Sequence, residues 1–137
     1  MADAALTNNP WFALGSSLLS GAVAVVISTL YYRHFELRRI KVDCFRRLLG
    51  ARYAITPDQH SPGAVETFFF ALNEAALIFS GVPAVISALK TLHADLPRSE
   101  RLHDNVVNLF RAMADHLGLS REELQDSFFL MPFKPPS

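Results

Sequence analysis

The sequence is poor in the residues that usually build a reaction centre. Its 137 residues include one cysteine, Cys44. This excludes an intramolecular disulfide and a zinc site built from several cysteines, so packing alone must hold the fold together. No two of the five histidines lie four residues apart, so a helical zinc motif is absent as well. The sequence also has no glycine-rich phosphate loop and no nucleophile elbow. We therefore expect no metal, no cofactor and no enzymatic activity.

Charge is missing from a long stretch near the N-terminus. Residues 11–32 contain no Asp, Glu, Lys or Arg. As a helix, these residues would span about 33 Å, close to the ~30 Å hydrocarbon core of a bilayer. Trp11 and Phe12 lie at one end and Tyr31 and Tyr32 at the other, where aromatic rings meet the lipid headgroups. The pattern predicts a transmembrane helix over residues 11–32.

The charges that are present lie unevenly along the chain. The formal net charge is zero and the mean hydropathy is +0.20, yet Asp3 is the only charged residue before position 33. Residues 33–52 carry a net charge of +5, and residues 53–137 carry −4. Because basic residues stay on the cytoplasmic side of a membrane, residues 1–10 are expected outside and the C-terminal domain inside.

A signal peptide or a buried helix of a soluble protein could also contain such an apolar stretch. A cleaved signal peptide has a basic segment before its apolar core, whereas no Lys or Arg precedes residue 11 here. A buried helix of a soluble protein can be apolar all round, but it is usually shorter and would not explain the basic residues that follow. A membrane span accounts for both features.

Small residues recur along one face of the predicted span. We call this face the small-residue ridge; it consists of Ser16, Ser17, Ser20, Gly21, Ala24 and Ser28. Small side chains at such spacing let helix backbones approach closely in lipid, which favours a homo-oligomer. In a larger ring, the serines of the ridge would line a narrow polar pore. Alternatively, small residues are simply tolerated in a moderately hydrophobic span.

No helix breaker separates the span from the basic residues, so one long helix is expected to continue to about Arg52. We call its bases the basic stretch: Arg33, Arg38, Arg39, Lys41, Arg46, Arg47 and Arg52. Their ordinary role would be attraction to anionic headgroups, worth on the order of 1 kcal/mol each near the surface. The alternative is a ring of arginines, formed by several subunits, that binds RNA or a nucleotide signal.

The rest of the chain predicts a small helical domain over residues 53–137, in an all-α protein. A loop around Pro57 should lead to a helix over residues 64–80, followed by helices over 83–96 and 99–117. Ser99 is the expected N-cap of the last of these and Gly118 its stop. A capping box of Ser120 and Glu123 would open a short final helix. The proline-rich tail is expected to pack on the bundle or on a neighbouring subunit.

Two features of the helix over residues 64–80 invite a structural prediction. Phe68, Phe69 and Phe70 exceed one helix face, so this helix is expected to be central and to contact partners on more than one side. Asn73 should face the buried side or its border, where it would bond to Arg52 or to a helix end.

Arg111 and His116 are the only weak catalytic candidates. Their spacing resembles the active-site motif of HEPN ribonucleases, which are helical proteins that cut RNA as dimers. However, a separation of five residues places two side chains about 140° apart on a regular helix, so they do not converge without distortion or a partner. Ala112 also stands where that family usually has a polar residue.

Larger parts of the chain resemble a family of uncharacterised bacterial and phage-borne single-span membrane proteins. The resemblance is carried by three groups: Phe45, Arg46, Leu48, Leu49 and Arg52; Ala71, Leu72, Asn73 and Phe79; and Leu109, Met113, Ala114, Leu117 and Gly118. The proline-containing segment after Gly81 and the proline-rich end depart from it. The resemblance implies no established activity. In layout, the chain is also similar to small membrane effectors of antiviral defence, including accessory proteins of RNA-targeting CRISPR systems.

The leading hypothesis is a non-enzymatic protein of the bacterial inner membrane that self-assembles and perturbs the bilayer when its cytoplasmic domain is engaged. Its expected partners are the lipid bilayer, further copies of itself and a protein, RNA or nucleotide at the cytoplasmic domain. The alternatives are a membrane-tethered module that binds RNA or a nucleotide through the basic stretch, and a HEPN-like ribonuclease.

Overall fold

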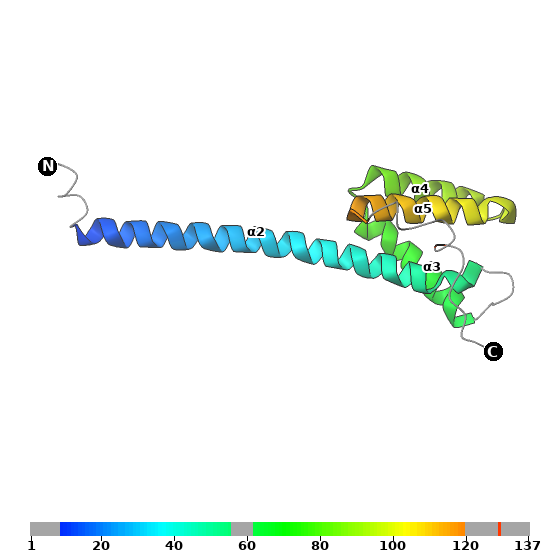
Figure 1. Cartoon of the computed structure of the whole chain (residues 1–137), viewed down its shortest axis with the longest axis horizontal. Helices are drawn as coiled ribbons and strands as arrows, with labels where there is room; N and C mark the ends of the chain where they lie inside the picture. Colours follow the sequence, from blue (N-terminus) through cyan, green and yellow to red (C-terminus); the bar gives the residue numbers. More distant parts are fainter. Residues whose placement is uncertain (1–8, 56–61, 120–128, 130–137) are drawn as a thin grey trace. The chain divides into compact units, whose positions relative to one another are not determined.

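The structure, a computed structural model, describes residues 9–55, 62–119 and 129. Within these residues the chain is helical and has no strand, which confirms the predicted all-α class. Its elements are α2 (Pro10–Gly50), η1 (Arg52–Ile55), α3 (Pro62–Ile78), α4 (Pro83–Asp95), η2 (Ser99–Arg101) and α5 (Leu102–Leu117) (Figure 1). The chain divides into two compact units, residues 1–37 and residues 38–137, and α2 contributes to both.

The first unit contains the apolar part of α2. The 41-residue helix runs without a break from the apolar residues into the basic stretch, so the prediction of one continuous helix is confirmed. One stretch of α2 is long and apolar enough to cross a membrane, and none of that stretch is buried. By length and composition it is a candidate membrane span; a signal sequence and the core helix of a soluble protein share these two properties.

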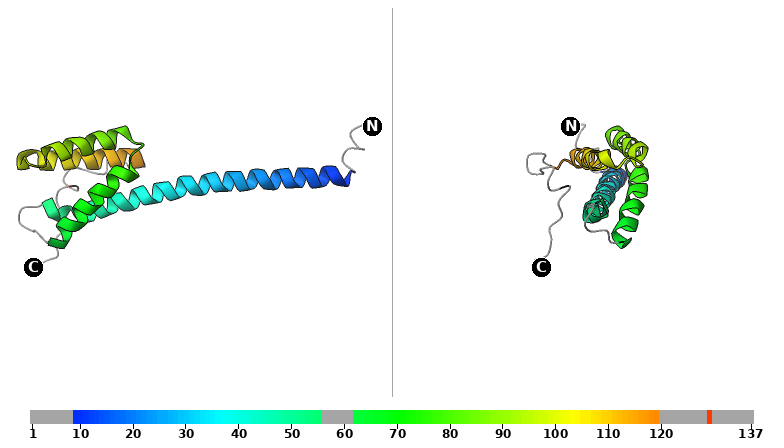
Figure 2. Two further views of the ribbon diagram at one scale, coloured as in Figure 1. Left: turned by 180° about the vertical axis from the view of Figure 1, so that it is seen from behind. Right: turned by 90° about the vertical axis from the view of Figure 1, so that its right-hand side faces the viewer.

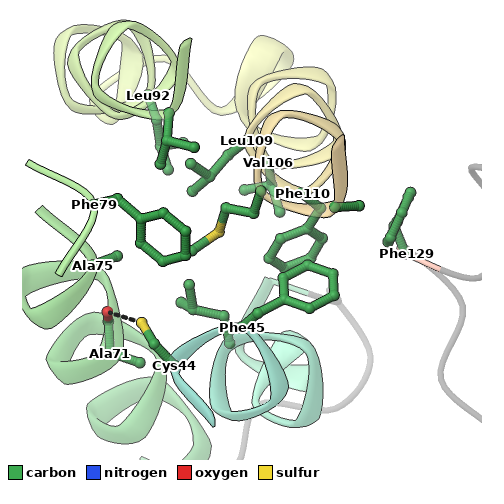
Figure 3. Close-up of a cluster of buried hydrophobic side chains, with 14 of the residues drawn as sticks. Cys44, Phe45, Ala71, Ala75, Phe79, Leu92, Val106, Leu109, Phe110 and Phe129 are labelled. Atoms are coloured by element: carbon green, nitrogen blue, oxygen red, sulfur yellow. Dashed lines mark hydrogen bonds between the residues drawn. The ribbon is translucent and has the colours of Figure 1, made fainter. Parts of the chain in front are cut away.

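The second unit is a bundle built around the last turns of α2. Cys44, Phe45 and Leu48 on α2 pack against α3 and α5 (Figure 3). The Phe45 and Phe110 rings meet edge to face with their centroids 6.0 Å apart, and Phe129 lies 5.7 Å from Phe110 on its other side. Edge-to-face pairs of this kind add about 0.5–1.5 kcal/mol beyond the area they bury.

Within the bundle, helices α4 and α5 lie side by side (Figures 1 and 2). The buried face of α5 matches the periodicity of the sequence, with Val106, Leu109, Phe110, Met113 and Leu117 all buried. The helix ends as predicted at Gly118, whose φ of +70° is the left-handed conformation that glycine adopts readily. Backbone bonds from Gly118 to Asp115 and from Leu119 to Ala114 close the last turn.

The predicted N-cap at Ser99 is wrong. Ser99 opens the short helix η2, and Arg101 precedes α5 without a side-chain capping bond. The Asn105 amide instead donates to the Asp95 carboxylate at 3.0 Å, which ties the first turn of α5 to the end of α4. This side-chain bond joins the two helices and does not replace an N-cap, because it accepts no backbone N–H of α5.

The prediction for α3 is correct in its position, and the helix contacts more than one other element. The helix covers Pro62–Ile78, and its buried side is formed by Phe68, Ala71, Ala75 and the following Phe79. Phe69 and Phe70 are exposed, while other sides of α3 contact α2, η1 and α4. The loop around Pro57 and the capping box at Ser120 and Glu123 lie outside the described residues.

Candidate functional site: the small-residue ridge and basic stretch of α2

All six residues of the small-residue ridge are exposed on α2. The Ser16 hydroxyl donates to the Ala13 carbonyl and the Ser20 hydroxyl to the Ser17 carbonyl, both at 3.0 Å. The Thr29 hydroxyl likewise donates to the Val25 carbonyl at 2.8 Å. Bonds of this kind satisfy a hydroxyl within its own helix. The ridge can therefore enter an apolar environment without leaving these hydroxyl donors unpaired.

Arg38, in the basic stretch, contacts the end of α5. One of its terminal nitrogens donates to the Leu117 carbonyl at 3.2 Å. Carbonyls of the last helical turn have no partner within the helix, and the helix dipole makes this end partly negative. Arg38 thus stabilises the C-terminus of α5.

Lys41 contacts His116 on α5, the residue before Leu117. Its ammonium lies 2.9 Å from Nε2 of His116 and 5.7 Å from the centre of the Phe79 ring. The Phe79 and His116 rings meet edge to face at 5.9 Å. Burial, and secondarily the Lys41 charge, lower the pKa of His116 below its usual 6.5. Since an ammonium only donates, the contact requires a neutral imidazole that carries its proton on Nδ1.

Arg47, in the basic stretch, forms an ion pair with α3. It lies 2.7 Å from the Glu74 carboxylate on α3. Beside it, Cys44 is buried and its thiol donates to the Ala71 carbonyl at 3.7 Å (Figure 3). Burial, with the nearby Glu74 charge, raises the pKa of Cys44 to about 11, while Arg47 opposes this shift. A thiol in this state is unreactive, and Cys44 serves as a core residue.

The remaining bases fall into two groups. Arg46 lies 3.8 Å from Asp43 one turn away, and Arg52 donates to the Leu49 carbonyl at 3.4 Å. Arg33 and Arg39 have no ion pair or side-chain hydrogen bond with any residue that the structure describes. The seven bases therefore do not form one uniform surface, because several of them hold the bundle together.

Arg111 and His116 line the same shallow depression. It has a volume of about 470 Å³ and lies between α5 and the start of α4, with Asp115 also on its wall. Nε2 of His116, however, already contacts the Lys41 ammonium. The two weak candidates thus share a surface, but one of the two ring nitrogens of His116 is already engaged with Lys41.

A groove between α3 and α4 is the feature that the sequence did not predict. It has a volume of about 370 Å³, and its lining consists of Phe69, Leu72, Asn73, Ala76, Ile86, Leu89, Lys90, Leu92, His93 and Leu96. Asn73 is exposed on this groove, so the prediction that it faces the buried side is wrong. The signal in the sequence was the run of three phenylalanines, since a single buried face cannot hold them all.

Comparison with known proteins gives no further direction. No protein-family model, no curated protein and no solved structure matches the chain. Among the residues that the structure describes, no group of three His, Cys, Asp or Glu side chains is placed to hold a metal ion. The function must therefore be inferred from the geometry of α2 and of the bundle.

Proposed function

We propose that this chain is a non-enzymatic, self-assembling membrane protein, anchored by residues 11–32 and carrying its helical bundle on the cytoplasmic side. The observation that supports it best is the exposed apolar length of α2, which no described part of the chain covers. An apolar surface of this extent is unfavourable in water and needs either lipid or other protein around it.

The basic stretch supports the proposed orientation. Its bases begin directly after the apolar residues, and none precedes them in the sequence. Arg33 and Arg39 are exposed and available to anionic headgroups at the end of the span. The positive-inside rule then gives an N-terminus outside and a bundle in the cytoplasm of a bacterial inner membrane.

The small-residue ridge supports self-assembly. Because Ser16 and Ser20 bond to their own backbone, two ridges can pack closely without leaving these two hydroxyls unpaired. The resemblance in layout to small defence effectors extends the proposal to an assembly that perturbs the bilayer, with a pore lined by Ser16, Ser20 and Ser28 as its most specific form.

The alternative functions have less support. A collar that binds RNA or a nucleotide needs bases that are free to meet phosphate, yet Arg38, Lys41 and Arg47 already have partners on α3 and α5. A ribonuclease needs a histidine able to exchange protons with substrate, yet Nε2 of His116 is bonded to Lys41.

Self-assembly is tested by counting fluorescently labelled chains in lipid nanodiscs by stepwise photobleaching. The proposal predicts several chains per disc. It predicts fewer when Ser20→Leu and Ala24→Leu replace small side chains of the ridge by large ones. Ala22→Leu is the matched control, because it adds similar bulk on the opposite side of α2 and should leave the count unchanged. One chain per disc under all conditions would contradict self-assembly.

The effect on the membrane needs a second measurement. Dye-loaded vesicles should leak when the wild-type chain is inserted, and leak less with the Ser20→Leu and Ala24→Leu variant. Self-assembly without leakage would favour a scaffold and would remove the pore.

A further inference from the structure

Helix α3 presents apolar side chains to the outside of the bundle. Phe70 is 63% exposed and Leu77 is 79% exposed. They lie seven residues apart and so point in nearly the same direction, about two helical turns from each other. Beside them on α3 lie Phe69, Asn73 and Ala76, which line the groove against α4. Projecting apolar side chains and an apolar hollow thus share one continuous surface.

Helix α3 contributes little charge to this surface, and Lys90 and His93 on α4 line the groove. Helix α3 carries two ionisable side chains, and Glu74 is turned to the other side, where it pairs with Arg47. Glu66 is exposed near the start of the helix, while Ser80, just past its end, is exposed and uncharged. The occupant of the groove must therefore offer projecting apolar side chains and no base opposite Lys90, and α3 itself, which has no Lys or Arg, meets that description.

We propose that a second copy of this chain covers the surface by laying its own α3 antiparallel against this one. With the two-fold axis at Asn73, Phe70 of each copy lies over the small Ala76 of the other, and Leu77 lies beside Phe69. Interfaces of this isologous kind use one patch twice and need it to be self-complementary, as it is here. The two Asn73 amides meet at the axis, where a paired polar residue fixes the register.

Charge selects this direction over a parallel one. A parallel pair would place the two Glu66 carboxylates together, whereas the antiparallel pair sets each Glu66 near Ser80 of the other copy. Lys90 on the rim of the groove also offers a base to an incoming acidic residue. The inference rests on the proposed function in one respect, since it assigns a second contact to the same self-assembly.

Cross-linking of the full chain in nanodiscs tests the register. Helices packed ~8–10 Å apart, each with a Cα radius of ~2.3 Å, bring facing Cα atoms within the ~4.4–6.8 Å that a disulfide spans. Asn73→Cys should therefore form a disulfide-linked dimer under mild oxidation. Phe70→Cys alone should not, because the two copies of residue 70 are offset along the axis, whereas Phe70→Cys combined with Ala76→Cys should.

Two controls keep the cross-linking specific. Cys44 stays in place, because it is buried and its thiol does not react. Thr91→Cys lies exposed on α4 and outside the groove lining, and it should give no dimer. Efficient cross-linking through Thr91→Cys, or through Phe70→Cys alone, would overturn the proposed register.

Substitution tests the energetics of the same surface. Phe70→Glu should weaken association at least about tenfold, since it would bury an unpaired carboxylate against apolar groups. Thr91→Glu adds the same charge elsewhere and should leave association unchanged. Because both side chains are exposed, each variant should keep the far-ultraviolet circular dichroism of the wild type.

The outcomes separate this inference from the proposed function. Several wild-type chains per disc, fewer after Phe70→Glu, and a dimer through Asn73→Cys support the α3 contact. Several chains per disc that Phe70→Glu does not reduce, together with no Asn73→Cys dimer, overturn the α3 contact. Self-assembly through the ridge then stands, and lipid or another protein covers the groove. One chain per disc overturns both.

Discussion

The two halves of α2 differ sharply in their surroundings although no break separates them. Leu18, in the first half, is 74% exposed, whereas Cys44 and Leu48, in the second, are fully buried. The first half carries no charge over residues 11–32, and the second alternates bases with apolar residues that face the bundle. A long apolar helix without charges needs apolar surroundings. An amphipathic helix, which has one apolar face, needs a partner on that face only.

This difference separates two roles for the same secondary structure. The first half adds nothing to the core of the bundle, so its substitutions should leave bundle stability unchanged and alter insertion or assembly. The second half supplies core side chains together with the bases that hold α3 and α5. Substitutions in the bundle and along α2 test whether the two halves have these separate roles.

The largest effect is expected at Phe110. Phe110→Ala removes a fully buried ring between Phe45 and Phe129 and should destabilise the bundle by about 3–5 kcal/mol. Val25→Ala, in the exposed half of α2, should leave the unfolding free energy of the bundle unchanged. Urea unfolding of both variants in nanodiscs, followed by circular dichroism, measures the difference. Equal losses would show that the two halves are not independent.

The ion pair between Arg47 and Glu74 comes next. Because the two side chains are 45% and 30% exposed, solvent screens the pair, and a double-mutant cycle should give a coupling of about 1 kcal/mol. The pair of Arg46 and Asp43 is longer and more exposed, and it should give a coupling near zero. Equal couplings would contradict the view that only part of the basic stretch holds the bundle.

Arg38 should show a smaller effect. Arg38→Ala removes the bond to the Leu117 carbonyl and should cost about 0.5–1 kcal/mol of bundle stability. Arg39→Ala is the matched control, since Arg39 is the neighbouring base and is exposed, and it should change stability by less than about 0.5 kcal/mol. The comparison is made by thermal unfolding of the two variants side by side. A greater loss from Arg39→Ala would reverse the assignment of these two bases.

The smallest effect is a dependence of stability on pH. The folded state lowers the pKa of His116 below 6.5, through burial first and Lys41 second, so the unfolded state binds more protons in this range. The contribution of neutral His116 is therefore complete above about pH 6.5 and lost as the pH falls through the lowered pKa. The melting temperature should drop between pH 7.5 and 5.5, and drop less in His116→Gln. An equal drop in both proteins would show that other groups cause it.

Local signals in the sequence predicted most of the helix positions. The uninterrupted run from Trp11 predicted α2, Pro83 the start of α4, and Gly118 the end of α5. Each depends on a residue and its near neighbours, for which backbone geometry leaves few choices.

The contacts of the candidate site could not be predicted from the sequence in the same way. Lys41 and His116 are 75 residues apart, and neither has a neighbour in the sequence that marks the other as a partner. The exposure of Phe69 and Asn73 depends on where α4 lies against α3, which no local pattern specifies. The pair of Arg47 and Glu74 also depends on the packing of α3 on α2, which no local pattern specifies.

The central claim is that α2 passes from lipid into the bundle along one unbroken helix. Nitroxide labels attached to single cysteines along α2 of the full chain in nanodiscs test it by electron paramagnetic resonance. The account predicts that labels near Val25 are accessible to oxygen and shielded from a water-soluble nickel complex, whereas labels at the exposed Arg39 meet the nickel complex. Access of the nickel complex at every position from Phe12 to Arg39 would contradict the claim.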